Sequence, residues 1–385
     1  MENLIPEQAL IVDLETSVKN RGEDAVGKQA GSPHHPDNEI VMSGHIVAPS
    51  KHELVLLTRT IYMYENRRFT LVGHNVKFDL LYMLKQQLVH KLENMVLWDT
   101  MIVEYLLSGQ TRKFCSLDML SEKYGGTKKD EKIKEYWDSG MDTEDIPKSE
   151  LEEYLKHDVL NTRLIYLEQR QKAEKLGMMP LIYAQMQALK ATTVMEYHGM
   201  KFDIFKALDE SKGLMEKARD LTERLTEAMI AGGIKDPNPM SNDHVSLYLF
   251  GGDQKYIDRV RVLDSDGNPV VYKSGIKKGE YKYKNVEVVQ TILRCFTPKK
   301  EWETSKKGIY RTGDDVLQEY ADYYWVRNLL ELRMINKDLN TYFVGYAKLM
   351  WPHDECIHGT INHCSTATGR MSSANPNLQN LSGKD

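Results

Sequence analysis

At 385 residues, the chain is long enough for two or three domains with sizeable hydrophobic cores. Its hydrophobic fraction of 41% and charged fraction of 28% are typical of a globular protein, and no segment resembles a membrane helix. The formal net charge of −5 argues against non-specific binding of polyanions by the whole surface, so any basic patch must be local. The N-terminus lacks a signal-peptide pattern, and we therefore expect a cytoplasmic protein.

The cysteines are scattered and show neither a disulfide framework nor a paired zinc spacing. They are Cys115, Cys295, Cys356 and Cys364. A zinc site formed by the last two with the nearby His358 and His363 is the alternative interpretation.

The first apolar segment, Ala9 to Thr16, carries two carboxylates one residue apart, Asp13 and Glu15. A short run rich in Ile, Val and Leu is typical of a buried strand, on which these two side chains point the same way. Two neighbouring carboxylates repel each other unless one is protonated or a cation lies between them. The segment alone predicts either a metal site or a strand that ends in polar residues.

A polar loop over residues 19–38 follows, and its adjacent pair His34-His35 is expected to be solvated, with a ligand role as the alternative. We then expect a second strand at 39–48 and a helix at 51–66.

The apolar segment at residues 70–84 predicts a short strand that turns through Gly73 into a helix. Asn75 suits the turn or the helix cap, and Asp79 lies one turn further on. A helix at 99–107 precedes a strongly charged stretch at 123–144, which we expect to be a solvated surface.

Ser149 and Glu152 have the spacing of a capping box and predict the start of a long helix. The core stripe of this helix comprises Leu151, Leu155, Val159, Thr162 and Tyr166. Tyr154 and Asp158, four residues apart, share the neighbouring face.

Three fragments therefore occur in order: D-x-E at Asp13, N-x-x-F-D at Asn75 and Y-x-x-x-D at Tyr154. This ordered set resembles the tyrosine-bearing branch of the DEDD superfamily of 3'-5' exonucleases. Position 153 is Glu rather than His, so the histidine-bearing branch fits less well.

The resemblance implies an α/β, ribonuclease-H-like domain that hydrolyses phosphodiesters with two Mg2+ or Mn2+ ions about 4 Å apart. The expected metal ligands are Asp13, Glu15, Asp79 and Asp158. Tyr154 is expected to orient the attacking water, because its ordinary pKa near 10 makes it a poor base at neutral pH. Asn75 is expected to contact DNA.

The middle of the chain is predicted to be helical, with helices at 181–199, 205–231 and 314–350. An insert at about 253–311 differs, because tyrosines alternate with lysines along strand-like runs. Between Lys255 and Arg311, 14 Lys and Arg face 7 Asp and Glu. This composition favours contact with a nucleic-acid backbone, and a solvated hairpin is the alternative. A processivity factor is another possible partner of the insert.

The C-terminal segment from His358 to Leu381 contains T-A-T-G-R-M-S-S-A-N-P-N-L-Q-N. It resembles a motif of family A DNA polymerases, and the preceding helical residues resemble the end of their thumb. The resemblance implies primer-template contacts from Thr368, Arg370, Ser372, Asn377 and Gln379.

The whole chain is thus expected to comprise an exonuclease domain at 1–178, a thumb-like region at 179–351 and the start of a palm at 352–385. The family's remaining palm and fingers motifs are not found, so polymerisation is expected to need a second polypeptide, as in a phage-type split polymerase. The function expected is metal-dependent 3'-5' proofreading during DNA replication. The alternatives are a catalytically silent DNA-binding subunit and an RNA-processing exonuclease of the same superfamily.

Overall fold

The computed structural model describes residues 5–19, 30–49, 53–57, 68–89, 92–127 and 132–380. The chain divides into two compact units, which are described separately. The first comprises Met1–Asp203 with Tyr346–Asp385, and the second comprises Ile204–Gly345. The domain boundary predicted at residue 178 stays a prediction, and the helix that follows this residue belongs to the first unit.

The first unit is built around a five-stranded sheet in the order β3-β2-β1-β4-β5. Its strands are β1 Ala9–Thr16, β2 Ile40–Ala48, β3 Val55–Leu57, β4 Phe69–Gly73 and β5 Met95–Asp99. β1 pairs antiparallel with β2 and parallel with β4, so it lies at the centre. The predicted strands at 9–16 and 39–48 are confirmed. The helix predicted at 51–66 is wrong at Val55–Leu57, which form a strand, and most of its remaining residues lie outside the described part.

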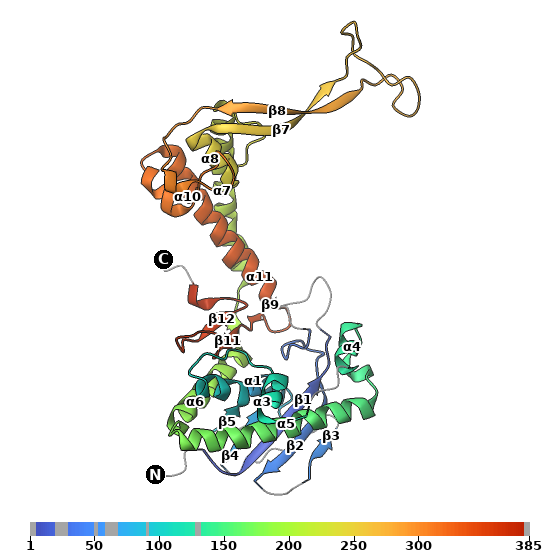
Figure 1. The fold of residues 1–385 in the computed structure, drawn as a ribbon, viewed down its shortest axis with the longest axis vertical. Helices are drawn as coiled ribbons and strands as arrows, with labels where there is room; N and C mark the ends of the chain where they lie inside the picture. Colours follow the sequence, from blue (N-terminus) through green and yellow to red (C-terminus); the bar gives the residue numbers. More distant parts are fainter. Residues whose placement is uncertain are drawn as a thin grey trace. The chain divides into compact units, whose positions relative to one another are not determined.

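Helices pack against this sheet and against one another (Figure 1). They are α1 Val76–Lys85, α2 Thr100–Leu107, α3 Leu117–Tyr124, α4 Lys132–Asp138, α5 Lys148–Lys175 and α6 Met179–His198. α5 packs against β1 and β2, whereas α6 packs against β5 and α1. The described residues of the charged stretch, 123–127 and 132–144, are mostly exposed as expected, but Ile133 and Thr143 are buried.

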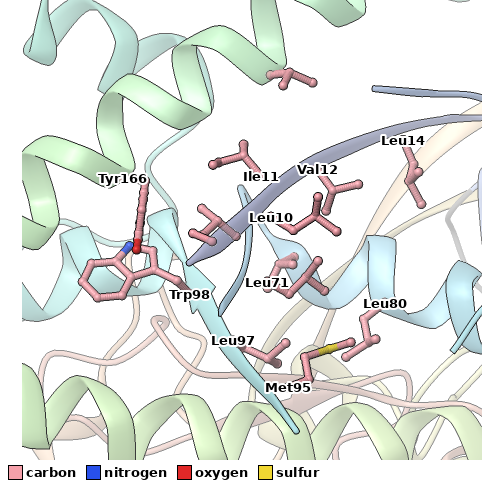
Figure 2. Packing of buried hydrophobic residues seen from close by; sticks show 14 of the residues in the cluster. Leu10, Ile11, Val12, Leu14, Leu71, Leu80, Met95, Leu97, Trp98 and Tyr166 are labelled. Carbon is pink, nitrogen blue, oxygen red and sulfur yellow. The ribbon is translucent and has the colours of Figure 1, made fainter. Parts of the chain in front are cut away.

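The core of the first unit forms because β1 is apolar on both faces, and Asp13 is its only residue that is not buried. Figure 2 shows Leu10, Leu71 and Leu80 gathered in this core. At another edge, the rings of Trp98 and Tyr166 meet almost perpendicularly with their centroids 5.3 Å apart. Tyr166 belongs to the predicted core stripe of α5, and every residue of that stripe is buried.

The capping box predicted at Ser149 and Glu152 is wrong. α5 begins one residue before Ser149, at Lys148, and Pro147 occupies the N-cap position. The carbonyl of Pro147 accepts the first hydrogen bonds of the helix, from the N–H groups of Glu150 and Leu151. Ser149 therefore lies inside the first turn, where its side chain cannot act as the cap.

The C-terminal residues add two small sheets to the first unit. One contains β6 Met200–Lys201, β9 Met350–Trp351 and β10 Cys356–Ile357, and the other is the hairpin of β11 Thr360–Asn362 and β12 Ser372–Ala374. The short helix α11 Tyr346–Leu349 precedes them, and a 3-10 turn at Leu378–Asn380 follows. The palm boundary at residue 352 stays a prediction.

The second unit is helical with a two-stranded ribbon (Figure 1). Its main elements are α7 Ile204–Ala231, α8 Asn242–Phe250, β7 Gly252–Arg261, β8 Tyr283–Ile292, α9 Asp314–Leu317 and α10 Tyr324–Asp338. The predicted helices at 205–231 and 181–199 are confirmed within two residues. Leu208 and Met215 of the expected α7 stripe are exposed, so only the C-terminal half of this stripe is core.

The single helix predicted at 314–350 is wrong. α9 passes into a 3-10 turn, and Tyr323 then adopts an extended conformation before α10 begins. Beyond α10, Leu339–Gly345 form a π-helix. Among the described residues, no helix is long and apolar enough to span a membrane.

Candidate active site

Three carboxylates from two distant parts of the sequence meet where α5 packs against β1. Asp13 and Glu15 come from β1 and Asp158 comes from α5, and their candidate ligand oxygens lie within 4.8 Å of one another. Glu15 and Asp158 are only 6% and 4% exposed. The structure thus brings together three of the four predicted metal ligands.

A glycine allows α5 to approach the sheet at this point. Gly44 of β2 pairs with Asp13, and a Cβ atom there would lie 2.9 Å from Val159 and 3.0 Å from Leu155. Any side chain at position 44 would therefore push α5 away from β1. The close approach places Asp158 beside Asp13.

The pairing of β1 with β2 is irregular beside the cluster. Glu15 pairs with Met42 and Thr16 pairs with Ile40, so Val41 forms a bulge opposite the last two residues of β1. Bulges bend a strand and re-aim its side chains, and they are common next to active sites. Regular pairing therefore ends where the carboxylates gather.

Asp79 of α1, the fourth predicted ligand, is 4% exposed and interacts electrostatically with Asp13. Burial, and then the negative charge of Asp13, raise the pKa of the Asp79 carboxyl well above its ordinary value. Four acidic groups in this space destabilise one another unless protons or cations neutralise them. Because all the donor atoms are oxygens, the set suits a hard divalent cation.

The start of α1 depends on a tight turn. A Cβ atom at Gly73 would lie 2.9 Å from Val76, and Asn75 adopts the left-handed conformation with φ 58°. The exposed Asn75 donates its backbone N–H to Asp99 Oδ1 at 3.3 Å. Asp99 also caps α2 by accepting from Met101 N–H, so one buried carboxylate joins two helix starts. Burial raises the pKa of Asp99 to about 6.

Tyr154 lies one turn before Asp158 on α5 and is half-buried. Its ring meets that of Trp137 at 90°, with the centroids 5.8 Å apart. This contact fixes the side of α5 on which the tyrosine ring lies. Its role in orienting water stays a prediction.

A cavity of about 500 Å3 opens beside the start of α1. Asn75 and Phe78 from the second sequence fragment line it, together with Phe114, Trp351 and Asn362. Aromatic rings and amide groups thus surround a space next to the helix that carries Asp79. Phe114 and Trp351 come from segments in which the sequence analysis identified no functional residue, whereas Asn362 belongs to the C-terminal segment that resembles a polymerase motif.

The predicted DNA-contacting residues of the C-terminal segment form the surface of the β11–β12 hairpin and the loop after it. Thr368, Arg370, Asn377 and Gln379 are exposed, and Ser372 is half-buried. The Ser372 hydroxyl lies 2.6 Å from that of Ser365. These residues are not part of the carboxylate cluster, and their contact with DNA stays a prediction.

An ion pair that the sequence did not predict ties this hairpin to α1. Lys77 Nζ donates to Glu196 Oε1 and to the carbonyl oxygen of Ile361, both at 2.8 Å. Glu196 also accepts from the Ile361 N–H. Lys77 lies inside the second sequence fragment, but its partners are 119 and 284 residues away, so no local pattern could reveal them.

The expectation that His34 is solvated is wrong, because its ring stacks on that of His358 at 3.8 Å. Burial lowers the pKa of His34 to about 3. His358 donates from Nδ1 to the carbonyl of Glu196, and its Nε2 lies 2.9 Å from Asp354 Oδ2.

The structure gathers only half of the four-residue zinc alternative: Cys356 and His358 lie with Asp354 in a group whose candidate ligand atoms are within 4.8 Å of one another, whereas His363 and Cys364 do not belong to that group. Both ring nitrogens of His363 are engaged, Nε2 with Thr192 and Nδ1 with Gln185, each at 2.8 Å. Cys364 is buried in the hydrophobic core of the first unit.

Two segments of the chain match known families. Residues 39–173 match the family described as 3'-5' exonuclease, and residues 283–385 match DNA polymerase family A. Similar proteins include DNA polymerase I of Bacillus caldotenax, 42% identical over 79 residues, and DNA polymerase I of Bacillus subtilis (strain 168), 40% identical over 73 residues. These alignments cover 20% and 19% of this chain, and only 9% and 8% of the relatives.

A solved structure with a similar fold is the POL domain of Pol1 from M. smegmatis in complex with DNA primer-template and dNTP. The TM-score is 0.61 at 15% sequence identity. The similarity covers 99% of this chain and 53% of that one. It shows the fold, with this chain spanning about half of the solved one.

Proposed function

We propose that this chain, which belongs to the family A DNA polymerases and carries a 3'-5' exonuclease domain, removes nucleotides from the 3' ends of DNA by hydrolysis. Proofreading during replication is the process that such an activity serves. The observation that carries the proposal is the meeting of Asp13, Glu15 and Asp158, with Asp79 in electrostatic contact. Buried carboxylates repel one another. Acids that lie far apart in the sequence would therefore not gather here by chance.

The cluster fits two Mg2+ or Mn2+ ions. By this proposal, Asp13, Glu15 and Asp158 hold one ion, and Asp13 and Asp79 hold the other. When bound, such a pair supplies an activated water and stabilises the charge that develops on the leaving oxygen. The raised pKa of Asp79 supports its place here, because a cation would offset the desolvation and repulsion that its ionised form meets.

The other residues would position the substrate and the water. Tyr154 would hold the attacking water by a hydrogen bond from α5, one turn from Asp158. Water would attack the terminal phosphorus, and the 3' oxygen of the preceding nucleotide would leave with a proton. The products would be a nucleoside 5'-monophosphate and a strand shortened by one residue.

A single-stranded 3' end is the substrate that the cavity beside α1 suits best. Phe78 and Phe114 offer rings against which a base can stack, and Asn75 offers an amide for hydrogen bonds. We assign primer-template contacts to the β11–β12 hairpin, through Arg370 and its neighbours. The M. smegmatis structure, which contains a primer-template, supports DNA as the ligand.

The test is degradation of a labelled single-stranded DNA with Mg2+. The wild-type chain should release nucleotides from the 3' end, and the D13A/E15A variant should not. D209A/E210A, which removes two exposed acids from α7, is the matched control and should remain active. An inactive wild-type protein that still binds DNA would favour the silent subunit instead. Faster degradation of RNA would favour the RNA-processing alternative.

A second polypeptide and a processivity factor are further proposals. The β11–β12 hairpin has two strands in the described part of the chain, and additional strands of a palm would complete its sheet. These strands would come from a second polypeptide, and the two chains together would polymerise DNA. Both would act in the same cytoplasm, which is that of a host cell if the protein is viral. Purification of the native protein with its bound partners tests this, and a lone monodisperse monomer would contradict it.

A further inference from the structure

The β7–β8 ribbon of the second unit is held at its base by hydrogen bonds and then extends into solvent. Its ten residue pairs, from Gly252–Ile292 to Arg261–Tyr283, are continuous without a shift in register. At the base, Gln254 bonds twice to the backbone of Lys235 and Gln290 bonds to the carbonyl of Gly233. Each strand spans about 34 Å, and Figure 1 shows both running away from α8. The ribbon is therefore an arm with a fixed base.

One face of the arm changes character along its length. Near the base this face exposes Ile257 and Val289. Further out, Arg259 lies over the ring of Tyr283 and Arg261 over that of Tyr281, each guanidinium carbon 4.6 Å from the ring centroid. These pairs are diagonal neighbours on the same face, because Arg261 pairs with Tyr283 across the strands.

The outer half of the arm is basic. Residues 259–284 contain seven Lys and Arg and three Asp and Glu, an excess of four positive charges in a chain whose net charge is −5. None of these seven cations lies within 4.0 Å of a carboxylate in the described part of the chain, whereas Lys255 near the base pairs with Glu287. The outer cations are thus available to an anionic partner.

The Arg–Tyr pairs indicate which part of a nucleic acid this face contacts. A guanidinium stacked on a ring keeps its N–H edge available for oxygen anions and loses little freedom on binding them. The covered rings cannot stack on bases with that face. Phosphate contact follows, and phosphates carry no sequence information. A two-stranded ribbon also fits the major groove of B-form DNA.

We infer that the outer half of the β7–β8 ribbon binds the phosphate backbone of double-stranded DNA, independently of sequence. This surface lies apart from the carboxylate cluster in the chain and adds a duplex-holding site to the proposed nuclease. The inference shares with the proposed function only the assumption that the chain acts on DNA. Duplex binding measured in EDTA, where metal-dependent hydrolysis is absent, lets either proposal fail without the other.

The experiment measures the affinity of the full chain for a blunt, fluorescent duplex over a range of KCl concentrations. In R259Q/R261Q, the slope of log K against log salt should become shallower by about 2, and affinity near 0.1 M salt should fall about tenfold or more. K172Q/K175Q makes the same charge change at exposed positions of α5 and should match the wild type. R259K/R261K keeps both charges and should keep the slope.

Two duplexes of unrelated sequence should bind equally, and a clear preference would overturn a contact confined to phosphates. Unchanged affinity and slope in R259Q/R261Q would overturn the inference itself. Loss of a co-purifying protein from that variant, with duplex binding intact, would show that the arm is a protein-docking surface instead. Thermal melting and 3' hydrolysis of single-stranded DNA should be the same in R259Q/R261Q and the wild type, which shows that the variant is folded.

Discussion

β1 and the β7–β8 ribbon use strands in opposite ways. β1 lies at the centre of a five-stranded sheet, and its Glu15 is buried beside Asp158. Among the described residues no third strand pairs with the ribbon, which carries Arg259 and Arg261 into solvent. One strand forces like charges together inside the protein, and the other spreads like charges along an exposed face.

The difference teaches what each site requires from its surroundings. The buried carboxylates repel in a poorly solvated space, so a tightly bound cation can relieve a large electrostatic cost. The exposed cations are well hydrated, and each contributes little until a polyanion collects several of them. We expect substitutions to have large local effects in the first site and small additive effects in the second.

The largest contrast should come from matched Asp→Asn changes. Asp158→Asn removes a ligand oxygen and should lower 3' exonuclease activity by about a thousandfold. The same variant without metal should melt at a higher temperature than the wild type, because a repelling charge has gone. Asp258→Asn on the exposed ribbon is the control and should leave both quantities unchanged. Activity of D158N within tenfold of the wild type would break the comparison.

A second contrast uses two ion pairs. Lys77→Ala leaves Glu196 buried without its partner and should cost about 3–5 kcal/mol in the free energy of unfolding. Lys255→Ala breaks an exposed pair with Glu287 and should cost at most about 1 kcal/mol. Urea denaturation measures both. The double variant K77M/E196L should recover most of the loss, and equal costs for the two single variants would contradict our account.

A third contrast compares two leucines. Leu10 of β1 is 1% exposed, and Leu263 beyond the end of β7 is 56% exposed. Leu10→Ala should destabilise the protein by about 2–5 kcal/mol, and Leu263→Ala by no more than about 0.5 kcal/mol. Urea denaturation of the two metal-free variants decides. A large effect of Leu263→Ala would mean that the arm packs against something.

The smallest effect concerns acid stability. The folded-state pKa of His34, about 3, is far below its ordinary value of 6.5. Between these two pH values, His34 is protonated in the unfolded chain and neutral in the folded chain. Stability is therefore lost as pH falls from about 6.5 toward 3. His34→Phe keeps the stack on His358 and should make the loss between pH 6.5 and 4 smaller by about 3 kcal/mol. Parallel pH profiles for the variant and the wild type would refute this assignment.

Local patterns predicted much of the first unit. The apolar run that begins at Ala9 predicted β1, and the stripe through Leu155 and Val159 predicted the buried face of α5, because both signals come from neighbouring residues. The family resemblance then supplied the expectation that Asp79 and Asp158 would approach β1. Their convergence itself follows from sheet order and from Gly44, which local sequence cannot reveal.

The sequence predicted less where tertiary contacts override local preference. The helical pattern from residue 314 onward did not reveal the break at Tyr323. The capping box failed because Pro147 starts α5 earlier. The stack of His34 on His358 and the pairing of Lys77 with Glu196 join residues more than a hundred positions apart.

The most direct test of the central claim is a Mn2+ titration followed by electron paramagnetic resonance, with wild-type and D13A/E15A chains side by side. The claim predicts two saturable Mn2+ sites in the wild type and their loss in the variant, while D209A/E210A binds as the wild type does. Identical titrations for wild-type and D13A/E15A chains would show that the four acids do not share cations, and would contradict the account.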